Sequence, residues 1–306
     1  MSRLVAVVFG ITIAACLAAC QIPAQADDPD VPPGTRQLRN LEYARPDGTP
    51  LRLDLYVPPS DGPLPLIIWV HGGGWMEGSK DEEFEALPLV WHGFAVASVN
   101  YRLSDQAVFP AQIHDVKAAV RFLRANAARF GLDPDRFGAW GESAGGHLVA
   151  LLGTTSVHGE LEGNEGVTGV SSRVQAVFDW YGPTDLLQRQ AQTPKGSPNA
   201  DAAGSTDSRL LGGPAPRNRE LAQQANPITY VTPGVPPFLI VHGDADTLVP
   251  IGQSQLLVQA LRRVNAPVQF IVVKGGQHGG DDYFSGDLYG EVQSFFDRHV
   301  KGGKRS

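Results

Sequence analysis

The feature that most restricts how this chain can fold is a Gly-x-Ser-x-Gly pentapeptide at residues 141–145. A short apolar run over 137–140 precedes it and predicts a strand, while the apolar run over 148–152 predicts the start of a buried helix. A serine on such a sharp strand-to-helix turn has its hydroxyl lifted clear of the sheet. The two glycines suit the turn because it leaves no room for side chains. The pattern predicts Ser143 as a nucleophile; the alternative is a Gly-rich loop whose serine only caps the helix.

Strand and helix patterns alternate along the rest of the chain. Strand patterns cover residues 51–57, 66–70, 94–99, 137–140, 174–178, 238–241 and 268–273. Helical patterns cover residues 82–91, 113–130, 253–264 and 288–300. The continuous apolar run at 66–70 is typical of a strand covered on both faces, whereas the apolar–polar alternation at 51–57 predicts an edge strand. We therefore expect an α/β fold with a mostly parallel central sheet wrapped by helices.

Residues 188–235 interrupt this alternation, since Gly, Pro, Ala and polar residues are frequent there. We expect a cap-like insertion after the sixth strand, lying over one end of the sheet. Because functional loops of such sheets lie at the carboxyl ends of the strands, the insertion would shape a substrate pocket. The single domain that carries it is predicted to span residues 38–301.

The beginning of the chain predicts an export signal. Arg3 supplies a positive start, and residues 4–19 are apolar over a length that suits a signal peptide better than a membrane span. The sequence offers two positions at which the signal peptide can be cleaved. Residues 17–20 resemble a bacterial lipobox, which would make Cys20 a lipidated residue, whereas cleavage after Ala26 would release a soluble protein.

We favour the lipobox. The signal peptide then covers residues 1–20, and the Pro- and Asp-rich residues 21–37 form a flexible tether. This predicts an exported envelope lipoprotein, whereas the alternative cleavage predicts a secreted or periplasmic protein.

Composition argues against several classes of function. The formal net charge is −7, so nucleic-acid binding, which needs clustered Lys and Arg, is not expected. Both cysteines, Cys16 and Cys20, lie in the export segment, so the domain has no disulfide and no cysteine metal ligand. We expect membrane contact only through a lipid on Cys20, and the sequence leaves the oligomeric state open.

A serine hydroxyl needs a base to take its proton and a group to orient that base. On this kind of sheet the order along the chain is serine, acid, histidine. The strand at 238–241 leads into Asp244 and Asp246, and the strand at 268–273 leads into the glycine-flanked His278. We assign the acid to Asp246, with Asp244 as the alternative, and the base to His278. Among the other histidines, His242 is expected to pack at a strand end and His147 to be structural. No partner can be assigned to the remaining four in helical or loop contexts: His92, His114, His158 and His299.

An oxyanion hole is the third requirement, because backbone N–H groups must meet the carbonyl oxygen as it becomes negative. Ala144, the residue after the nucleophile, supplies one donor. Gly73 and Gly74 after the early strand are the candidates for the second, with Gly72 as the alternative, since glycines let the backbone approach a substrate closely.

These motifs together resemble the α/β-hydrolase superfamily and, within it, the hormone-sensitive-lipase-like serine esterases. The resemblance is strongest to bacterial acetyl and feruloyl esterases of the acetylxylan type. It rests on His71-Gly72-Gly73-Gly74-Trp75, Gly141-Glu142-Ser143-Ala144-Gly145-Gly146, Asp246-x-x-Val249-Pro250 and His278-Gly279. It implies a Ser143–Asp246–His278 triad, an oxyanion hole at Gly73, Gly74 and Ala144, and no cofactor or metal.

The resemblance also implies a function. We expect a carboxylesterase that hydrolyses short-acyl or aryl esters through an acyl-enzyme, with acetyl or feruloyl groups on plant polysaccharides as candidate substrates. An exopeptidase or amidase on the same scaffold and an inactive envelope binding module are the alternatives. Asp179, Trp180 and Tyr181 are candidates for lining the pocket, although core packing is as good an interpretation for Trp180.

Overall fold

The computed structural model describes residues 30–82, 84–155, 161–280, 283 and 287–302. The predicted signal peptide at 1–20, the cleavage position at Ala26 and the tether residues 21–29 lie outside the described residues. Within the described ranges, no helix combines the length and the apolar character that crossing a membrane requires.

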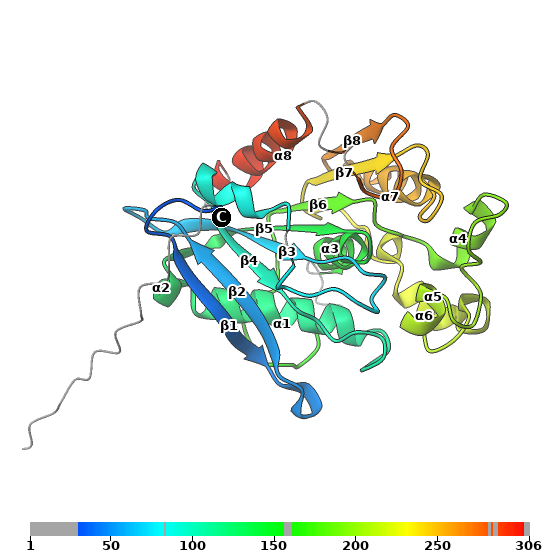
Figure 1. Cartoon of the computed structure of the whole chain (residues 1–306), viewed down its shortest axis with the longest axis horizontal. Coiled ribbons are helices and arrows are strands. Elements are labelled where there is room, and N and C mark those ends of the chain that lie inside the picture. Colours follow the sequence, from blue (N-terminus) through cyan, green and yellow to red (C-terminus); the bar gives the residue numbers. More distant parts are fainter. Residues whose placement is uncertain (1–29, 83, 156–160, 281–282, 284–286, 303–306) are drawn as a thin grey trace, which may run out of the picture.

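The described residues form an eight-stranded sheet in the order β1-β2-β4-β3-β5-β6-β7-β8 (Figure 1). Strand β2 pairs antiparallel with β1 and with β4, and the remaining neighbours are parallel. The strands are β1 (Arg36–Ala44), β2 (Leu51–Val57), β3 (Leu64–Val70), β4 (Ala95–Val99), β5 (Leu132–Glu142), β6 (Ala176–Trp180), β7 (Phe238–Gly243) and β8 (Val268–Val273). The predicted α/β class and mostly parallel sheet are confirmed.

Helices cover both faces of the sheet (Figure 1). They are α1 (Ala111–Ala125), α2 (Ala127–Phe130), α3 (Ala144–Thr155), α4 (Leu186–Gln192), α5 (Thr206–Leu210), α6 (Arg219–Gln224), α7 (Gly252–Arg263) and α8 (Leu288–Phe296). Shorter 3-10 turns are η1 (Pro46–Gly48), η2 (Leu87–His92), η3 (Ala215–Arg217) and η4 (Pro227–Tyr230), and a π-helical turn, η6 (Asp297–Lys301), follows α8.

Strand β3 shows how the sheet divides the core. Its side chains alternate between two buried clusters: Ile68 belongs to the cluster with α1, α3 and α7, and Trp69 to the cluster with η2 and α8. Side chains of a strand point to opposite faces in turn, so a strand that is apolar at every position needs cover on both sides. The prediction from residues 66–70 is thus confirmed.

Strand β2 is not an edge strand, and this prediction was wrong. Strand β1 pairs along it and takes the edge instead. The polar Asp54 that gave the alternation is buried, where Arg39 and Lys80 pair with its carboxylate at 3.0 and 3.1 Å. An ion pair lets a charged residue occupy a buried face.

The domain also begins earlier than predicted. Val31 is 5% exposed and packs in the core, and β1 starts at Arg36. The predicted tether over 21–37 is therefore too long at its carboxyl end.

The predicted helix over 82–91 was wrong as well. The described part of this segment is turns followed by η2, which ends at His92 and is capped by the left-handed Gly93. Pro88 explains the difference, because proline has no N–H and disfavours helical geometry in the residue before it. The predicted helix over 113–130 is present as α1 and α2, divided at Asn126, and it ends at the predicted cap, Gly131.

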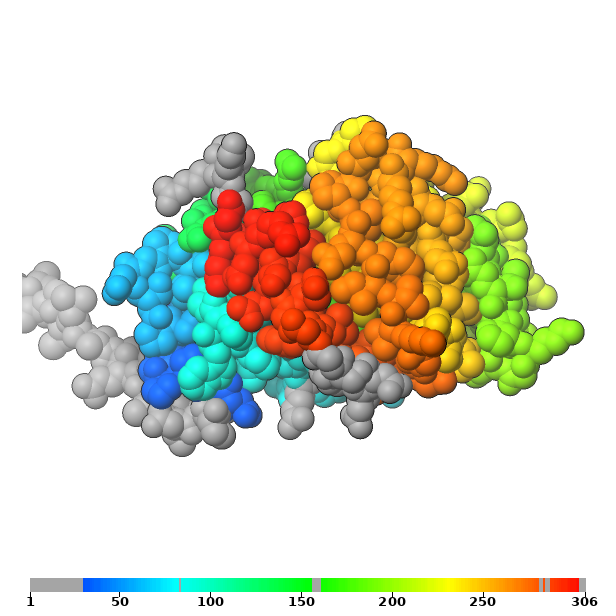
Figure 2. Space-filling model, turned by 90° about the horizontal axis from the view of Figure 1, so that it is seen from above, coloured from blue at the N-terminus to red at the C-terminus, as the bar shows by residue number. Residues whose placement is uncertain are grey.

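The inserted segment follows β6 and lies beyond the carboxyl ends of the parallel strands. Figure 1 shows α4, α5 and α6 gathered there, and Figure 2 shows the same green segment at one end of the molecule. Buried His147 on α3 holds the inserted segment, because its Nε2–H donates to the carbonyl of Ala225 at 2.7 Å. The insertion therefore lies next to the nucleophile turn.

Candidate active site

The turn at Ser143 has the shape that its sequence predicts. Strand β5 ends at Glu142, α3 begins at Ala144, and Ser143 lies between them with a positive φ of 49°. Its N–H donates to the carbonyl of Trp180 at 2.8 Å. Side chains at the flanking glycines would overlap backbone carbonyls, that of Gly145 for Gly141 and that of Val70 for Gly145. Only glycine fits this close packing of strand and helix.

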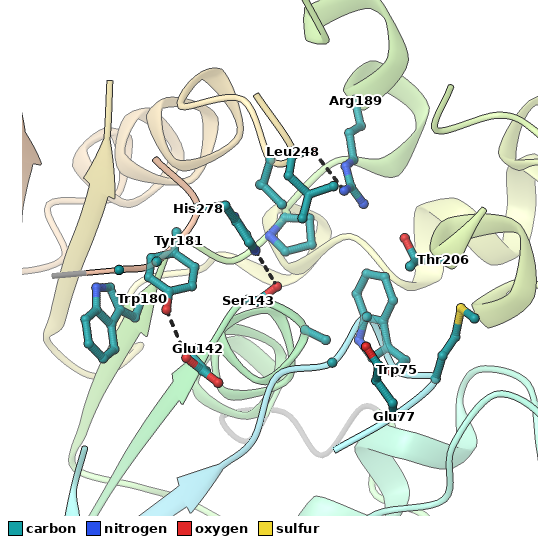
Figure 3. A pocket seen from close by; sticks show the side chains of 18 of the residues that line it. Trp75, Glu77, Glu142, Ser143, Trp180, Tyr181, Arg189, Thr206, Leu248 and His278 are labelled. Atoms are coloured by element: carbon teal, nitrogen blue, oxygen red, sulfur yellow. Dashed lines mark hydrogen bonds between the residues drawn. The ribbon is translucent and has the colours of Figure 1, made fainter. Parts of the chain in front are cut away.

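The three predicted residues of the triad meet in one hydrogen-bonded chain. Ser143 Oγ lies 2.8 Å from His278 Nε2, and His278 Nδ1 lies 2.7 Å from Asp246 Oδ2 (Figure 3 draws the first contact). Because a carboxylate can only accept, Nδ1 carries the proton and Nε2 is left to accept from the serine hydroxyl. The arrangement can therefore move the serine proton to the imidazole as the oxygen attacks a carbonyl carbon.

Asp246 is held as an anion by its surroundings. It is 5% exposed, and burial alone raises its pKa. Hydrogen bonds from His242 and His278 and from the N–H of Val249 outweigh the effect of burial. The pKa of Asp246 therefore lies well below its usual range. An ionised acid beside His278 can stabilise the imidazolium that forms during proton transfer.

Asp244, the alternative acid, lies elsewhere. Its carboxylate accepts from the N–H of Gly275 at 2.6 Å, and its own N–H donates to the carbonyl of Val273. This is the local turn role expected for the aspartate that is not the acid.

The loop after β3 brings candidate oxyanion donors to the nucleophile. Gly73 and Gly74 line the same cavity as Ser143 and Ala144, and Gly72 does not. Among the described residues, the N–H groups of Gly73 and Gly74 donate to no acceptor. The N–H of Ala144 belongs to the first turn of α3, where helix N–H groups have no partner within the helix. Three amide groups are thus available at the cavity that holds the nucleophile.

The cavity has a volume of about 460 Å³, and three carboxylates line it. They belong to Glu77, Glu85 and Glu142, and the Tyr181 hydroxyl donates to Glu142 at 2.9 Å (Figure 3). Burial, reinforced by the charge of Glu142, raises the pKa of Glu85 to about 7. Carboxylates beside aromatic rings are suited to accepting hydrogen bonds from a hydroxyl-rich ligand.

The inserted segment also lines the cavity. Arg189 on α4 and Thr206 on α5 line it (Figure 3). Nη1 of Arg189 pairs with buried Asp207, and Nη2 donates to the carbonyl of Leu248 at 3.0 Å. Leu248 itself is 45% exposed at the cavity. Arg189 therefore joins the insertion to the loop that carries Asp246.

Two of the three residues predicted at the end of β6 to line the pocket do line the cavity. Trp180 and Tyr181 do so, and Trp180 also packs in the core against Trp140 and Tyr283. Asp179 does not: it is buried behind the turn and accepts from the N–H of Gly182, while burial raises its pKa to about 6.

Sequence reasoning missed the roles of Glu85, Arg189 and His242. Arg189 and Glu85 lie in segments with no motif, so no signal marked them. For His242 there was one signal, its place at the end of the strand that leads to Asp246, and the structure shows its ring contacting that carboxylate. No group of three or more His, Cys, Asp or Glu side chains in the described part of the chain is arranged to hold a metal ion.

Comparisons with known proteins show what the chain is similar to. The sequence profile of the family described as BD-FAE matches residues 53–261. Esterase LipC of Mycobacterium tuberculosis is 34% identical over 222 residues, which cover 72% of this chain and 54% of that protein. The chain spans about half the length of the curated relatives it matches.

Solved structures are similar over most of the chain. A truncated form of a carbohydrate esterase from gut microbiota is 32% identical, with a TM-score of 0.78, and the match covers 87% of this chain and 96% of that one. A bifunctional GH43-CE protein of Bacteroides eggerthii is 36% identical, with a TM-score of 0.76, over 86% of this chain and 38% of that one.

Proposed function

Because the chain belongs to the BD-FAE family of α/β hydrolases, we propose that it is a serine carboxylesterase. One observation carries the proposal: Ser143, His278 and Asp246 form a continuous hydrogen-bonded chain in a cavity lined by free backbone N–H groups. That combination of nucleophile, base, orienting acid and oxyanion donors is what acyl transfer needs.

The proposed reaction has two steps. In the first, Ser143 Oγ attacks the ester carbonyl carbon, its proton passes to His278 Nε2, and the carbonyl oxygen becomes negative beside the amides of Gly73, Gly74 and Ala144. The imidazolium then gives this proton to the leaving alcohol, and an acyl-enzyme remains. In the second step, a water molecule attacks the acyl-enzyme and gives a proton to His278 Nε2. As the second tetrahedral intermediate collapses, His278 returns that proton to Ser143 Oγ, and the carboxylic acid leaves the free serine.

The test of this activity is hydrolysis of p-nitrophenyl acetate by the purified protein and by Ser143→Ala. We expect the variant to lose at least about 10³-fold in kcat, because the nucleophile and its base act as a unit. Equal rates for the two proteins would refute the esterase assignment.

We further propose that the substrates are short-acyl or aryl esters, with acetyl or feruloyl groups on plant polysaccharides as the leading candidates. Two observations support this. Similar solved structures include a carbohydrate esterase, and the cavity combines the aromatic rings of Trp180 and Tyr181 with the acceptors Glu77 and Glu142. Aromatic faces and carboxylates suit a sugar, which presents both apolar faces and hydroxyl donors.

A substrate panel tests this finer assignment. Rates on p-nitrophenyl acetate, p-nitrophenyl butyrate, methyl ferulate and acetylated xylan should be highest for the acetyl and feruloyl compounds. Faster hydrolysis of aminoacyl anilides would instead favour an exopeptidase or amidase on the same scaffold.

We propose that the catalytic domain, with its cap-like insertion, is exported and anchored at Cys20. The support is the sequence of residues 1–20 alone. Replacing Cys20 by Ser should move the protein from the membrane fraction to the soluble fraction, and an unchanged distribution would favour cleavage after Ala26.

A further inference from the structure

The carboxylate of Asp246 accepts from two imidazoles, not one. Its Oδ2 lies 2.7 Å from His278 Nδ1 and 3.2 Å from His242 Nε2. Its Oδ1 accepts from the N–H groups of Leu248 and Val249 at 2.8 and 2.9 Å. Four donors therefore surround the acid, and each oxygen is held by two of them.

The surroundings of His242 determine which of its nitrogens carries the proton. The ring is fully buried at the end of β7, and Nε2 faces both Asp246 Oδ2 and the carbonyl of Val249, the latter at 2.8 Å. Neither oxygen can donate, because one is a carbonyl and the other belongs to an ionised carboxylate, so the proton must lie on Nε2. Nδ1 lies 2.7 Å from Ser254 Oγ on α7, and in the neutral ring it accepts from that hydroxyl.

Other polar groups face this ring from neighbouring elements. Tyr181, which follows β6, lies edge-on at 6.5 Å between ring centroids, and buried Asp179 on β6 interacts electrostatically with His242. His278 faces it only across the shared oxygen of Asp246. Of the two groups to which Nε2–H donates, the carbonyl of Val249 and Asp246 Oδ2, only Asp246 belongs to the triad, so any effect on catalysis passes through that acid.

We propose that His242 is a positioning residue for the triad: its Nε2–H fixes the Asp246 carboxylate and shares its negative charge while His278 gains and loses a proton. This role rests on the proposed esterase function. Without His242, Oδ2 would be held by His278 alone, and the carboxylate would keep three of its four donors, the other two being the amides at Oδ1. Its full charge would also fall on His278, which would favour the protonated imidazole that cannot act as a base.

The test compares His242→Leu, which removes the donor, with His242→Gln, whose amide can place an N–H near the same position. Both are measured beside the wild-type protein, with kcat, KM and the pH profile of kcat/KM. We expect His242→Leu to lose about 10- to 100-fold in kcat, the range for one hydrogen bond to a charged group, with KM nearly unchanged. The acidic limb of the pH profile of kcat/KM should move to higher pH in this variant. His242→Gln should recover most of both effects.

A purely structural role predicts something else. An unchanged acidic limb in His242→Leu, or equal losses in the Leu and Gln variants, would overturn the proposal. Ser143→Ala separates the two hypotheses: hydrolysis that survives this change would refute the esterase itself, whereas an inactive Ser143→Ala beside an unaffected His242→Leu would refute only the role of His242.

A measurement on the wild-type protein covers the case in which His242→Leu does not fold. Histidine labelled with ¹⁵N reports by NMR which ring nitrogen carries the proton, and the missing signals in His242→Gln assign the ring. We expect a proton on Nε2 of His242. An unprotonated Nε2 cannot donate to Asp246, so that result would overturn the proposal.

Discussion

At the scale of single residues, backbone shape decides what can occupy the loop after β3. Gly73 has φ of 83°, a region that L side chains rarely adopt, and a Cβ there would overlap the carbonyl oxygen of Glu77. The same loop presents the free amides near Ser143. A side chain at Gly73 would therefore displace the amides that the proposed reaction needs.

Gly73→Ala should accordingly lower kcat on p-nitrophenyl acetate by about 10²-fold or more, the effect of losing an oxyanion donor. Gly48→Ala is a matched control, because Gly48 has φ of 85° but open space where a Cβ would lie. In the control, the similar backbone strain should lower the unfolding free energy, and kcat should not change. Equal kcat losses in the two variants would contradict the role given to the loop.

The raised pKa of Glu85 predicts that the stability of the protein depends on pH. Burial and Glu142 raise its folded pKa to about 7, above its value in the unfolded chain. A carboxyl with a raised folded pKa destabilises the protein as pH rises from about 4.5 to about 7, and the full penalty remains above that range.

Replacing Glu85 by Gln removes this penalty. We expect Glu85→Gln to raise the unfolding free energy at pH 8 by about 1–3 kcal/mol, and to leave it nearly unchanged at pH 4.5, where the carboxyl is protonated. Urea unfolding at the two pH values measures the difference. A variant that is stabilised equally at both would show that the carboxylate is not penalised in the folded protein.

Motif residues could be predicted from the sequence because each has a fixed relation to a strand end. Ser143 and His278 follow two strands of one parallel sheet, and such strands end at the same edge. Glu85 and Arg189 could not be predicted, since only the tertiary fold brings their segments to the cavity. His242 was expected to pack at a strand end; its contact with Asp246 depends on how the loop of residues 244–250 returns over β7.

At the scale of elements, a buried ion pair and a proline account for the two wrong predictions, the edge strand at 51–57 and the helix at 82–91. The alternation in β2 indicated an edge strand, but Asp54 is neutralised by Lys80 and Arg39, and charge pairing cannot be read from strand periodicity. The apolar spacing at 82–91 is compatible with a helix, yet Pro88 limits the segment to a 3-10 turn. Long parallel strands with apolar residues at every position, such as β3, were predicted correctly because only a covered sheet tolerates them.

The inserted segment should depend on one buried pair, Arg189 with Asp207. Arg189→Met leaves the carboxylate of Asp207 without its partner, so we expect the unfolding free energy to fall by about 3–5 kcal/mol. The double variant Arg189→Met/Asp207→Leu should recover most of that loss, because no uncompensated charge remains. Urea unfolding of the two single variants and the double variant gives the coupling. Additive losses would mean that the pair does not hold the insertion.

At the scale of the whole molecule, the sheet collects residues that are distant in the sequence at one edge. The loop after β3, the turn after β5 and the loops after β7 and β8 all leave the carboxyl ends of parallel strands, and the insertion covers them (Figure 1). The two buried clusters on either face keep these strand ends fixed relative to one another. A packed sheet that carries the reacting groups on loops at one edge is an arrangement that positions them closely.

In the proposed reaction, His278, oriented by Asp246, makes Ser143 reactive. The most direct measurement treats the wild-type protein and His278→Gln with a fluorophosphonate, followed by intact mass determination and peptide mapping. We expect one adduct per chain, on Ser143, in the wild-type protein and labelling slower by at least about 10³-fold in His278→Gln. Labelling at another residue, or equal labelling rates in the two proteins, would contradict the claim.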